Sequence, residues 1–279
     1  MTRSNTVACA MSASLLLALV GCGGRPDHVV ARRVDGDLPR SDPFAPAWEG
    51  LPEFEATLQP QNVVTPHLTE GSVSRVRVRA LHDGSWLAVR LEWEDETDDH
   101  NVTTSTFSDA AAVQFPAGEV RGSPMMGNDG APVDIVYFRA AWQTADNMGE
   151  LYPNMPPIYH PPEAAAEGEP RQEMERHYQA AAHAGNPTVA RPEGASVVAF
   201  SAAGFGTLSP QEGQFAVDGR GEHRDGHWYV VISREMGTPL AAGARTAMAS
   251  AVWNGSNGEV GSRKNRSDWV DLEIEGGGS

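Results

Sequence analysis

The sequence is poor in cysteine. Of its 279 residues only two are cysteines, Cys9 and Cys22, and both lie near the N-terminus. The rest of the chain can form no disulfide and can supply no thiolate to zinc or to an iron–sulfur cluster. The motif Cys-x-x-Cys-His is also absent, which excludes covalently attached c-type haem. Any metal centre in the main part of this protein must therefore be held by other side chains.

Long apolar runs are absent as well. The run at residues 8–20 is shorter than the roughly 20 residues that a membrane-spanning helix needs, and no second run reaches that length. It follows Arg3 and ends in Leu-Val-Gly before Cys22, which matches a bacterial lipobox. We therefore expect residues 1–21 to be a lipoprotein signal peptide; an ordinary cleaved signal peptide is the alternative.

In this interpretation Cys22 carries the lipid and residues 22–45 form a tether. Several acyl chains on one N-terminus give stable membrane attachment. We expect the protein to be periplasmic and to touch the membrane only through this anchor, with Gly23 after the cysteine favouring the outer membrane.

Positive charge is scarce too. The formal net charge is −16, and binding to a nucleic-acid backbone needs clustered Lys and Arg, so no nucleic-acid partner is expected. The sequence also lacks the Gly-x-Ser-x-Gly, His-Glu-x-x-His and phosphate-loop motifs. We therefore predict no catalytic residues in this chain.

Acidic residues gather in the stretch EDETDDH at residues 94–100. Such carboxylates could bind calcium, but their spacing fits no EF-hand loop, and a solvated acidic loop is the preferred interpretation. A hydrolase that uses this loop is a further alternative, for which no paired base and nucleophile can be named. Asp109, at the entrance of an expected strand, is interpreted as a turn or supporting residue.

Short runs of β-forming residues recur along the chain, separated by Pro, Gly, Asn and Asp. This pattern is typical of strands joined by turns, and residues 82–85 predict a hairpin. We predict a mainly β fold, an antiparallel β-sandwich with long loops and a short helical excursion, as one domain over residues 46–276. The expected strands cover residues 75–79, 86–93, 110–115, 133–138, 196–200, 214–217, 228–234, 247–253 and 269–274.

The segment 147–192 interrupts the strand pattern. It is rich in proline and alanine, and residues 173–182 are predicted to form two or three helical turns. Loops of this length inside a domain are usually functional or face a partner. Its Met174, His177 and His183 are interpreted as solvated side chains rather than ligands.

Two loops far apart in the sequence carry candidate ligands. Met125 and Met126 stand in Pro-Met-Met-Gly, and Lys264 stands in GSRKNRSDW. Methionine pairs usually pack in cores, which is the first interpretation. The alternative is that one thioether binds a haem iron, because these sulfurs lie on a turn rather than on an apolar stripe.

Lys264 is the expected partner of that thioether because it is the one lysine beside 20 arginines. Arginine does not lose its proton in proteins and cannot ligate a metal, whereas a lysine amine can. A buried, apolar site would lower the pKa of the lysine and favour its neutral form. A thioether and an amine would fill both axial positions of a haem iron, which leaves a centre suited to electron transfer rather than to substrate chemistry.

Several segments, in order over residues 57–276, carry a resemblance to a known family. They are SRVRVRALHDGSWLAVRLEWEDET, FSDAAAVQFP, SPMMGNDGAPVDIVYF, GFGTLSP, DGHWYVVISREM and ASAVWNGSNGEVGSRKNRSDWVDLEI. Together they resemble the haem-b-binding gamma subunits of ethylbenzene dehydrogenase, dimethylsulfide dehydrogenase, selenate reductase and chlorate reductase.

The resemblance implies a β-sandwich that holds one haem b non-covalently. Its axial ligands would be Met126, or Met125 if the register shifts by one, and Lys264. It also implies an electron-transfer subunit whose partners are an iron–sulfur beta subunit and the molybdopterin alpha subunit of a type II molybdoenzyme. A lipid-anchored chain could instead pass electrons to a soluble c-type cytochrome.

A haem-free β-sandwich lipoprotein that binds carbohydrate or another ligand is the competing hypothesis from a different class. Such proteins present aromatic side chains, and core packing is the simpler interpretation of each tryptophan in this chain. The tryptophans concerned are Trp86, Trp93, Trp142, Trp228, Trp253 and Trp269.

Overall fold

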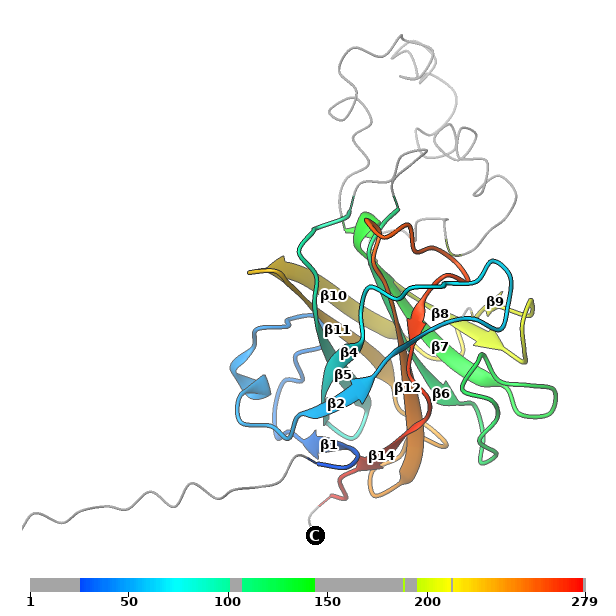
Figure 1. Cartoon of the computed structure of the whole chain (residues 1–279). Helices are drawn as coiled ribbons and strands as arrows, with labels where there is room; N and C mark the ends of the chain where they lie inside the picture. Colours follow the sequence, from blue (N-terminus) through cyan, green and yellow to red (C-terminus); the bar gives the residue numbers. More distant parts are fainter. Residues whose placement is uncertain (1–25, 101–106, 144–187, 189–194, 212, 278–279) are drawn as a thin grey trace, which may run out of the picture.

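The computed structural model describes residues 26–100, 107–143, 188, 195–211 and 213–277, and their regular structure is almost entirely β (Figure 1). The predicted mainly β class is thus confirmed. Helical structure in the described residues consists of two 3-10 turns, η1 Pro46–Trp48 and η2 Ala140–Trp142. In chain order the strands are β1 Val29–Arg33, β2 Phe54–Thr57, β3 Gln59–Pro60, β4 Arg75–His82, β5 Trp86–Glu94, β6 Ala110–Pro116, β7 Val133–Arg139, β8 Val197–Ala202, β9 Ser209–Pro210, β10 Val217–Arg224, β11 His227–Glu235, β12 Arg245–Trp253, β13 Asn265–Arg266 and β14 Val270–Ile274.

The strands form two layers that share β12. Hydrogen-bonded neighbours follow the order β10-β11-β5-β4-β1-β14-β12-β6-β7-β8-β9. Residues 245–248 of β12 pair with β14, and residues 249–253 pair with β6, so the strand passes from the first layer into the second. The path folds over at this strand, because β10 and β11 at one end contact β7 and β8 near the other.

The main core fills the space between the layers. Trp228 on β11 and Phe138 on β7 meet edge to face, with ring centroids 6.0 Å apart, and both are almost fully buried. Every second side chain of a strand points to the same face, and this places both residues between the layers. Each large apolar side chain buried there contributes roughly 1.5–3 kcal/mol to stability.

The predicted hairpin at residues 82–85 is present between β4 and β5. The side-chain oxygen of Asp83 accepts hydrogen bonds from the backbone N–H groups of Ser85 and Trp86, both at 2.7 Å. Gly84 adopts a φ of 94°, which a side chain would oppose. Local turn chemistry thus sets the register of the two central strands of the first layer.

The prediction of a tether over residues 22–45 is wrong for β1. This strand lies between β4 and β14 and pairs in parallel with both, so the sandwich is not purely antiparallel. The short run VVARR sits among Pro, Asp and Gly residues, and its place depends on two strands that are distant in sequence. Its pairing was therefore not readable from the local pattern.

The strand predicted at residues 214–217 is also misplaced, since β10 begins at Val217 and runs to Arg224. Its sequence is polar and contains two glycines, which local propensity disfavours in strands. A Cβ at Gly221 would lie 2.5 Å from the Phe138 ring, and one at Gly219 would lie 2.8 Å from the Val197 side chain. Glycine is needed there because β10 packs closely on the second layer.

The segment between β1 and β2 covers the outer face of the first layer. Trp48 is buried there, and its Nε1 donates to the carbonyl of Asp42 at 2.8 Å. It forms a small apolar cluster with Leu38, Leu81 and Val231. Both faces of the first layer are therefore covered.

Several predictions fall outside the described residues. They concern the signal peptide, Cys22, the helical turns at residues 173–182, and the side chains of Met174, His177 and His183. In the part of the chain that the structure does describe, no helix has the length and hydrophobicity required to cross a bilayer.

Candidate functional site

A cavity of about 310 Å³ lies on the outer face of the second layer, opposite the main core. Its walls come from β6, β7, β8 and β12, from the loop between β6 and β7, and from the segment before β13. The loop provides Met125 and Met126, and the segment provides Lys264. The structure therefore brings all three predicted haem-ligand candidates to one cavity.

The floor of the cavity follows from the strand register. One row across the sheet consists of Ala249, Gln114, Ile135 and Phe200, because these residues are cross-strand partners. The alanines of β6 and β12 leave room above the sheet, while the aromatic and branched residues stand around it. The next two rows are Ala251, Ala112, Tyr137 and Val198, and then Trp253, Ala110 and Arg139.

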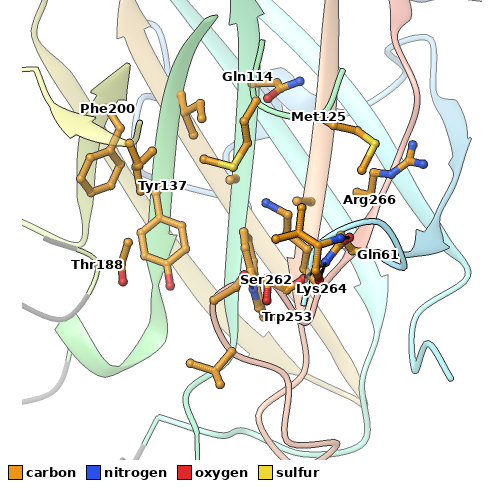
Figure 2. A pocket seen from close by; sticks show the side chains of 18 of the residues that line it. Gln61, Gln114, Met125, Tyr137, Thr188, Phe200, Trp253, Ser262, Lys264 and Arg266 are labelled. Carbon is orange, nitrogen blue, oxygen red and sulfur yellow. Dashed lines mark hydrogen bonds between the residues drawn. The ribbon is translucent and has the colours of Figure 1, made fainter. Parts of the chain in front are cut away.

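Figure 2 shows how the labelled side chains surround this space. Gln114 and Met125 lie in the upper part of the view, and Trp253 lies in the lower part. Tyr137 packs edge to face on Trp253, with ring centroids 5.4 Å apart. The methionine loop thus meets the cavity near the Gln114 row, and the Trp253 row forms its other end.

The methionine loop is held by hydrogen bonds at several points. The side-chain Nε2 of Gln114 donates to the carbonyl of Pro124, and Trp269 Nε1 donates to the carbonyl of Gly122 at 2.7 Å. The backbone N–H of Gly127 donates to the carbonyl of Ser123 at 2.9 Å. The two methionines are therefore presented on a fixed turn.

Met126 itself has a left-handed backbone, with a φ of 68°. Such a conformation costs a residue with a side chain about 1–2 kcal/mol and persists where the surrounding structure holds it in place. Its carbonyl accepts a hydrogen bond from the N–H of Gly204 at 2.8 Å. A Cβ on the neighbouring Gly127 would lie 2.9 Å from the carbonyl of Ala131, so the chain has little room to relax.

Lys264 reaches the cavity from the side of β13. Its Nζ lies 5.2 Å from the centre of the Trp253 ring. Among the described residues, no hydrogen bond or ion pair is made by this amine. Burial, and to a smaller extent the charge of Arg266, lower the pKa of Lys264 to about 8. The neutral amine that a metal requires is thus far more accessible than for an exposed lysine.

The segment that carries Lys264 is braced by a buried carboxylate. Glu259 accepts hydrogen bonds from the backbone N–H of Asn254 at 2.8 Å and from Asn265 Nδ2 at 2.8 Å. The hydroxyl of Ser72 donates to the same carboxylate at 2.8 Å. These bonds fix the residue directly after Lys264, and the sequence alone contained no signal for them.

Asp109 is a supporting residue, as predicted, and does not line the cavity. Its carboxylate accepts hydrogen bonds from Trp228 Nε1 at 2.9 Å and from the backbone N–H groups of Gly255 and Asp99, at 2.8 and 2.7 Å. Burial raises the pKa of Asp109 to about 7. Asp109 therefore connects Trp228 of the core to the segment between β12 and β13, which contains Lys264.

The acidic loop at residues 94–100 is not uniformly solvated. Asp95 is buried, and Asp99 accepts a hydrogen bond from the N–H of Ser256 at 2.8 Å. Over the described residues, no group of three or more His, Cys, Asp or Glu side chains is arranged to hold a metal ion. The described part of the loop packs against the segment around Ser256.

The tryptophans mostly pack in the interior, as expected. Trp93 and Trp228 stack within the main core, with ring centroids 6.2 Å apart. Trp142 and Trp253 are buried around Tyr137 at the cavity. None of these four forms an exposed platform for a sugar.

The pair of ligand types gives the site its chemistry. A thioether and a neutral amine are donors suited to a transition metal, and the surrounding wall is largely apolar. Arg139 and Arg266 also line the cavity, and the sequence reasoning did not identify either one. For Arg139 a signal was available, since it shares one face of β7 with Ile135 and Tyr137.

Comparison with known proteins gives two kinds of match. The model of a family described as ethylbenzene dehydrogenase matches residues 45–265. A Haloferax mediterranei protein, provisionally named respiratory nitrate reductase heme subunit ORF7, is 28% identical over 280 residues, covering 95% of this chain and 81% of that protein.

Among solved structures, two carbohydrate-binding modules of family 9 from Caldicellulosiruptor kristjanssonii align with the chain, one in complex with glucose and one with cellotriose. Both give a TM-score of 0.39, at 6% and 7% identity, covering 90% of this chain and 97% and 95% of theirs. Similarity at this level supports no conclusion about a ligand.

Proposed function

This chain belongs to the ethylbenzene dehydrogenase family, and from that premise we propose that it is the haem-b subunit of an oxidoreductase complex. The observation that carries the proposal is the position of Lys264. The one lysine of the chain stands in an apolar cavity, without a polar partner among the described residues, beside a methionine loop. The nitrate reductase heme subunit to which the chain is similar has a name consistent with this role.

The residues present fit a single, non-covalently bound haem b. When bound, the haem supplies a one-electron centre. Lys264 would supply one axial ligand, and its lowered pKa reduces the cost of removing its proton. Met126 is the proposed second ligand, because the strained, hydrogen-bonded turn fixes its position. Lys264 and Met126 together would leave the iron no open position for a substrate, which favours electron transfer without catalysis.

We propose that the electrons pass between this chain and an iron–sulfur subunit that serves a molybdopterin catalytic subunit, or a c-type cytochrome. The strongly acidic chain would favour a partner with a basic face. We further propose that the protein acts in the periplasm, attached through lipid on Cys22, with the outer membrane favoured. These assignments extend the predictions made from the sequence.

A haem titration followed by absorption spectroscopy tests the cofactor and the lysine. The wild-type chain should bind one haem and give a six-coordinate, low-spin spectrum, whereas Lys264→Ala should lose it. Arg245→Ala is the matched control, because Arg245 is exposed and pairs with Glu273 away from the cavity. A wild-type chain that gains no Soret band after haem is added would overturn the proposal.

The two methionines can be separated in the same experiment. Leucine is close to methionine in volume, so neither exchange should unfold the protein. Met126→Leu should abolish the six-coordinate, low-spin spectrum because one iron ligand is lost, and Met125→Leu should leave the spectrum unchanged. The reverse result would assign the ligand to Met125.

A further inference from the structure

Three arginine side chains are buried in the described structure, and one of them differs from the others. Arg90 is 7% exposed and pairs with Glu92 at 3.1 Å, and Arg234 is 6% exposed and pairs with Asp134 at 2.9 Å. Arg139 is 9% exposed, yet within the residues described here no carboxylate lies within ion-pair distance of it. A buried charge is costly unless it is paired, so an anion placed beside this guanidinium would be stabilising.

Arg139 faces the cavity. It ends β7 on the same face as Ile135 and Tyr137, in the row that contains Trp253. Its Nη1 donates to the backbone carbonyl of Thr188 at 3.1 Å, which holds the side chain but does not neutralise it. Figure 2 shows Thr188 at the left of the view, near Tyr137, and Met125 at the upper right. The Arg139 charge belongs to the Trp253 row, whereas the methionine loop is bonded to the Gln114 row, so the two lie at opposite ends of the cavity floor.

The charges around the cavity point the same way. The ionisable side chains that line it include three bases, Arg139, Arg266 and Lys264, and one carboxylate, Glu259. Arg266 pairs with Asp268, and Glu259 is occupied by Asn254 and Asn265. Lys264 is proposed to act as a neutral amine, so Arg139 is the base of this lining that has neither a carboxylate partner among the described residues nor a role as ligand. A largely apolar cavity with this guanidinium suits a ligand that carries a negative charge on an otherwise apolar body.

We propose that Arg139 binds a carboxylate of the cavity's ligand through a charge-assisted hydrogen bond. The inference rests on the proposed haem function, and for haem b this carboxylate is a propionate. Arg139 would hold that propionate at the Trp253 row of the cavity. It is a positioning residue that selects carboxylate-bearing porphyrins and does not touch the iron.

The test compares two probes, iron protoporphyrin IX and its dimethyl ester, in which both propionates are neutral. A hydrogen bond to a charged group contributes enough that wild-type protein should bind the free acid roughly ten- to a hundredfold more tightly than the ester. Arg139→Gln should largely abolish the preference for the free acid over the ester, and Arg139→Lys should retain part of it. Arg245→Gln, which removes an exposed charge, should keep the wild-type preference.

The low-spin spectrum supplies a readout that separates the two proposals. With Arg139→Gln, haem should bind more weakly but keep the ligands of the wild type, whereas Lys264→Ala changes the spectrum itself. Equal affinity of wild-type protein for acid and ester would overturn the role of Arg139 while leaving the haem assignment intact, and this comparison needs no variant to fold. If the wild-type chain binds neither probe, both proposals fail.

Discussion

The two faces of the second layer use the same strands for different purposes. On the inner face, Val113, Val136 and Phe138 pack against the first layer and are fully buried. On the outer face, their neighbours Ala112 and Tyr137 border a cavity. The sequence alternates between the two sets along β6 and β7, so adjacent residues face a close-packed core and an open pocket.

The difference between these faces separates stability from function. The side chains of the inner face pack against other side chains of the same core. The outer face retains a strained methionine, an amine of lowered pKa and a buried guanidinium without a carboxylate partner among the described residues. Each of these features costs folding free energy, and a suitable ligand would bind the amine and pair the guanidinium. Substitutions on the inner face should therefore weaken folding, and those on the outer face should weaken binding.

The largest effect is expected from Phe138→Ala on the inner face. Removing a buried phenylalanine typically costs about 3–5 kcal/mol of unfolding free energy, because of the lost burial and the cavity that remains. Tyr137→Ala is the matched change on the outer face, and it should cost clearly less because Tyr137 already borders open space. Urea unfolding of the two haem-free variants measures both values, and equal losses would break the contrast between the faces.

An intermediate effect is expected at Asp109, which joins Trp228 of the core to the backbone of Gly255. In Asp109→Asn the amide NH₂ cannot accept a hydrogen bond, whereas both oxygens of the carboxyl group now accept from N–H donors. The variant should lose about 1–3 kcal/mol at pH 5, because a buried donor then has no acceptor. Urea unfolding at pH 5 gives this value directly.

The pH dependence of that loss has a definite sign. The folded pKa of Asp109 is raised to about 7, above that of the unfolded chain. Between about pH 4 and 7 the folded state therefore binds the extra proton, and wild-type stability falls as pH rises. The deficit of Asp109→Asn should shrink between pH 5 and pH 8. Parallel stability curves for the two proteins would contradict this account of Asp109.

A gain in stability, instead of a loss, is expected at Lys264 without haem. Its pKa is about 8 in the folded state and higher in the unfolded chain, so the buried charge costs stability at pH 7. Lys264→Gln should be more stable than wild type there, by about 1–3 kcal/mol. The wild-type chain should recover this difference between about pH 8 and 10.5, where only its unfolded state holds the proton. A variant that is less stable at pH 7 would show that the lysine supports the fold instead.

The sequence predicted most of the fold because alternation and turn residues are local signals. The β4–β5 hairpin is an example, since Asp83 and Gly84 define it by themselves. The predictions failed for strands whose position depends on contacts with residues far away in the sequence. β1 depends on two strands far away in the chain, and β10 contains glycines because Phe138 and Val197 approach it closely.

The candidate site divides in the same way. Met125, Met126 and Lys264 could be named because their chemistry is unusual in this sequence, and the structure brings them to one cavity. The supports of the site were not identified. Glu259 resembles an ordinary charged residue until the fold shows its hydrogen bonds to Asn254 and Asn265. Arg139 shares a face of β7 with two residues of the cavity, but only the fold shows that it is buried and lacks a carboxylate partner in the described structure.

The central claim is that the outer face holds a haem between the methionine loop and Lys264. An experimental structure of the haem-loaded chain tests it most directly. The account predicts iron bonded to the sulfur of Met126 and to the Nζ of Lys264, above the alanine floor. Iron bound without Lys264 or without a methionine of the loop, or a haem outside this cavity, would contradict it.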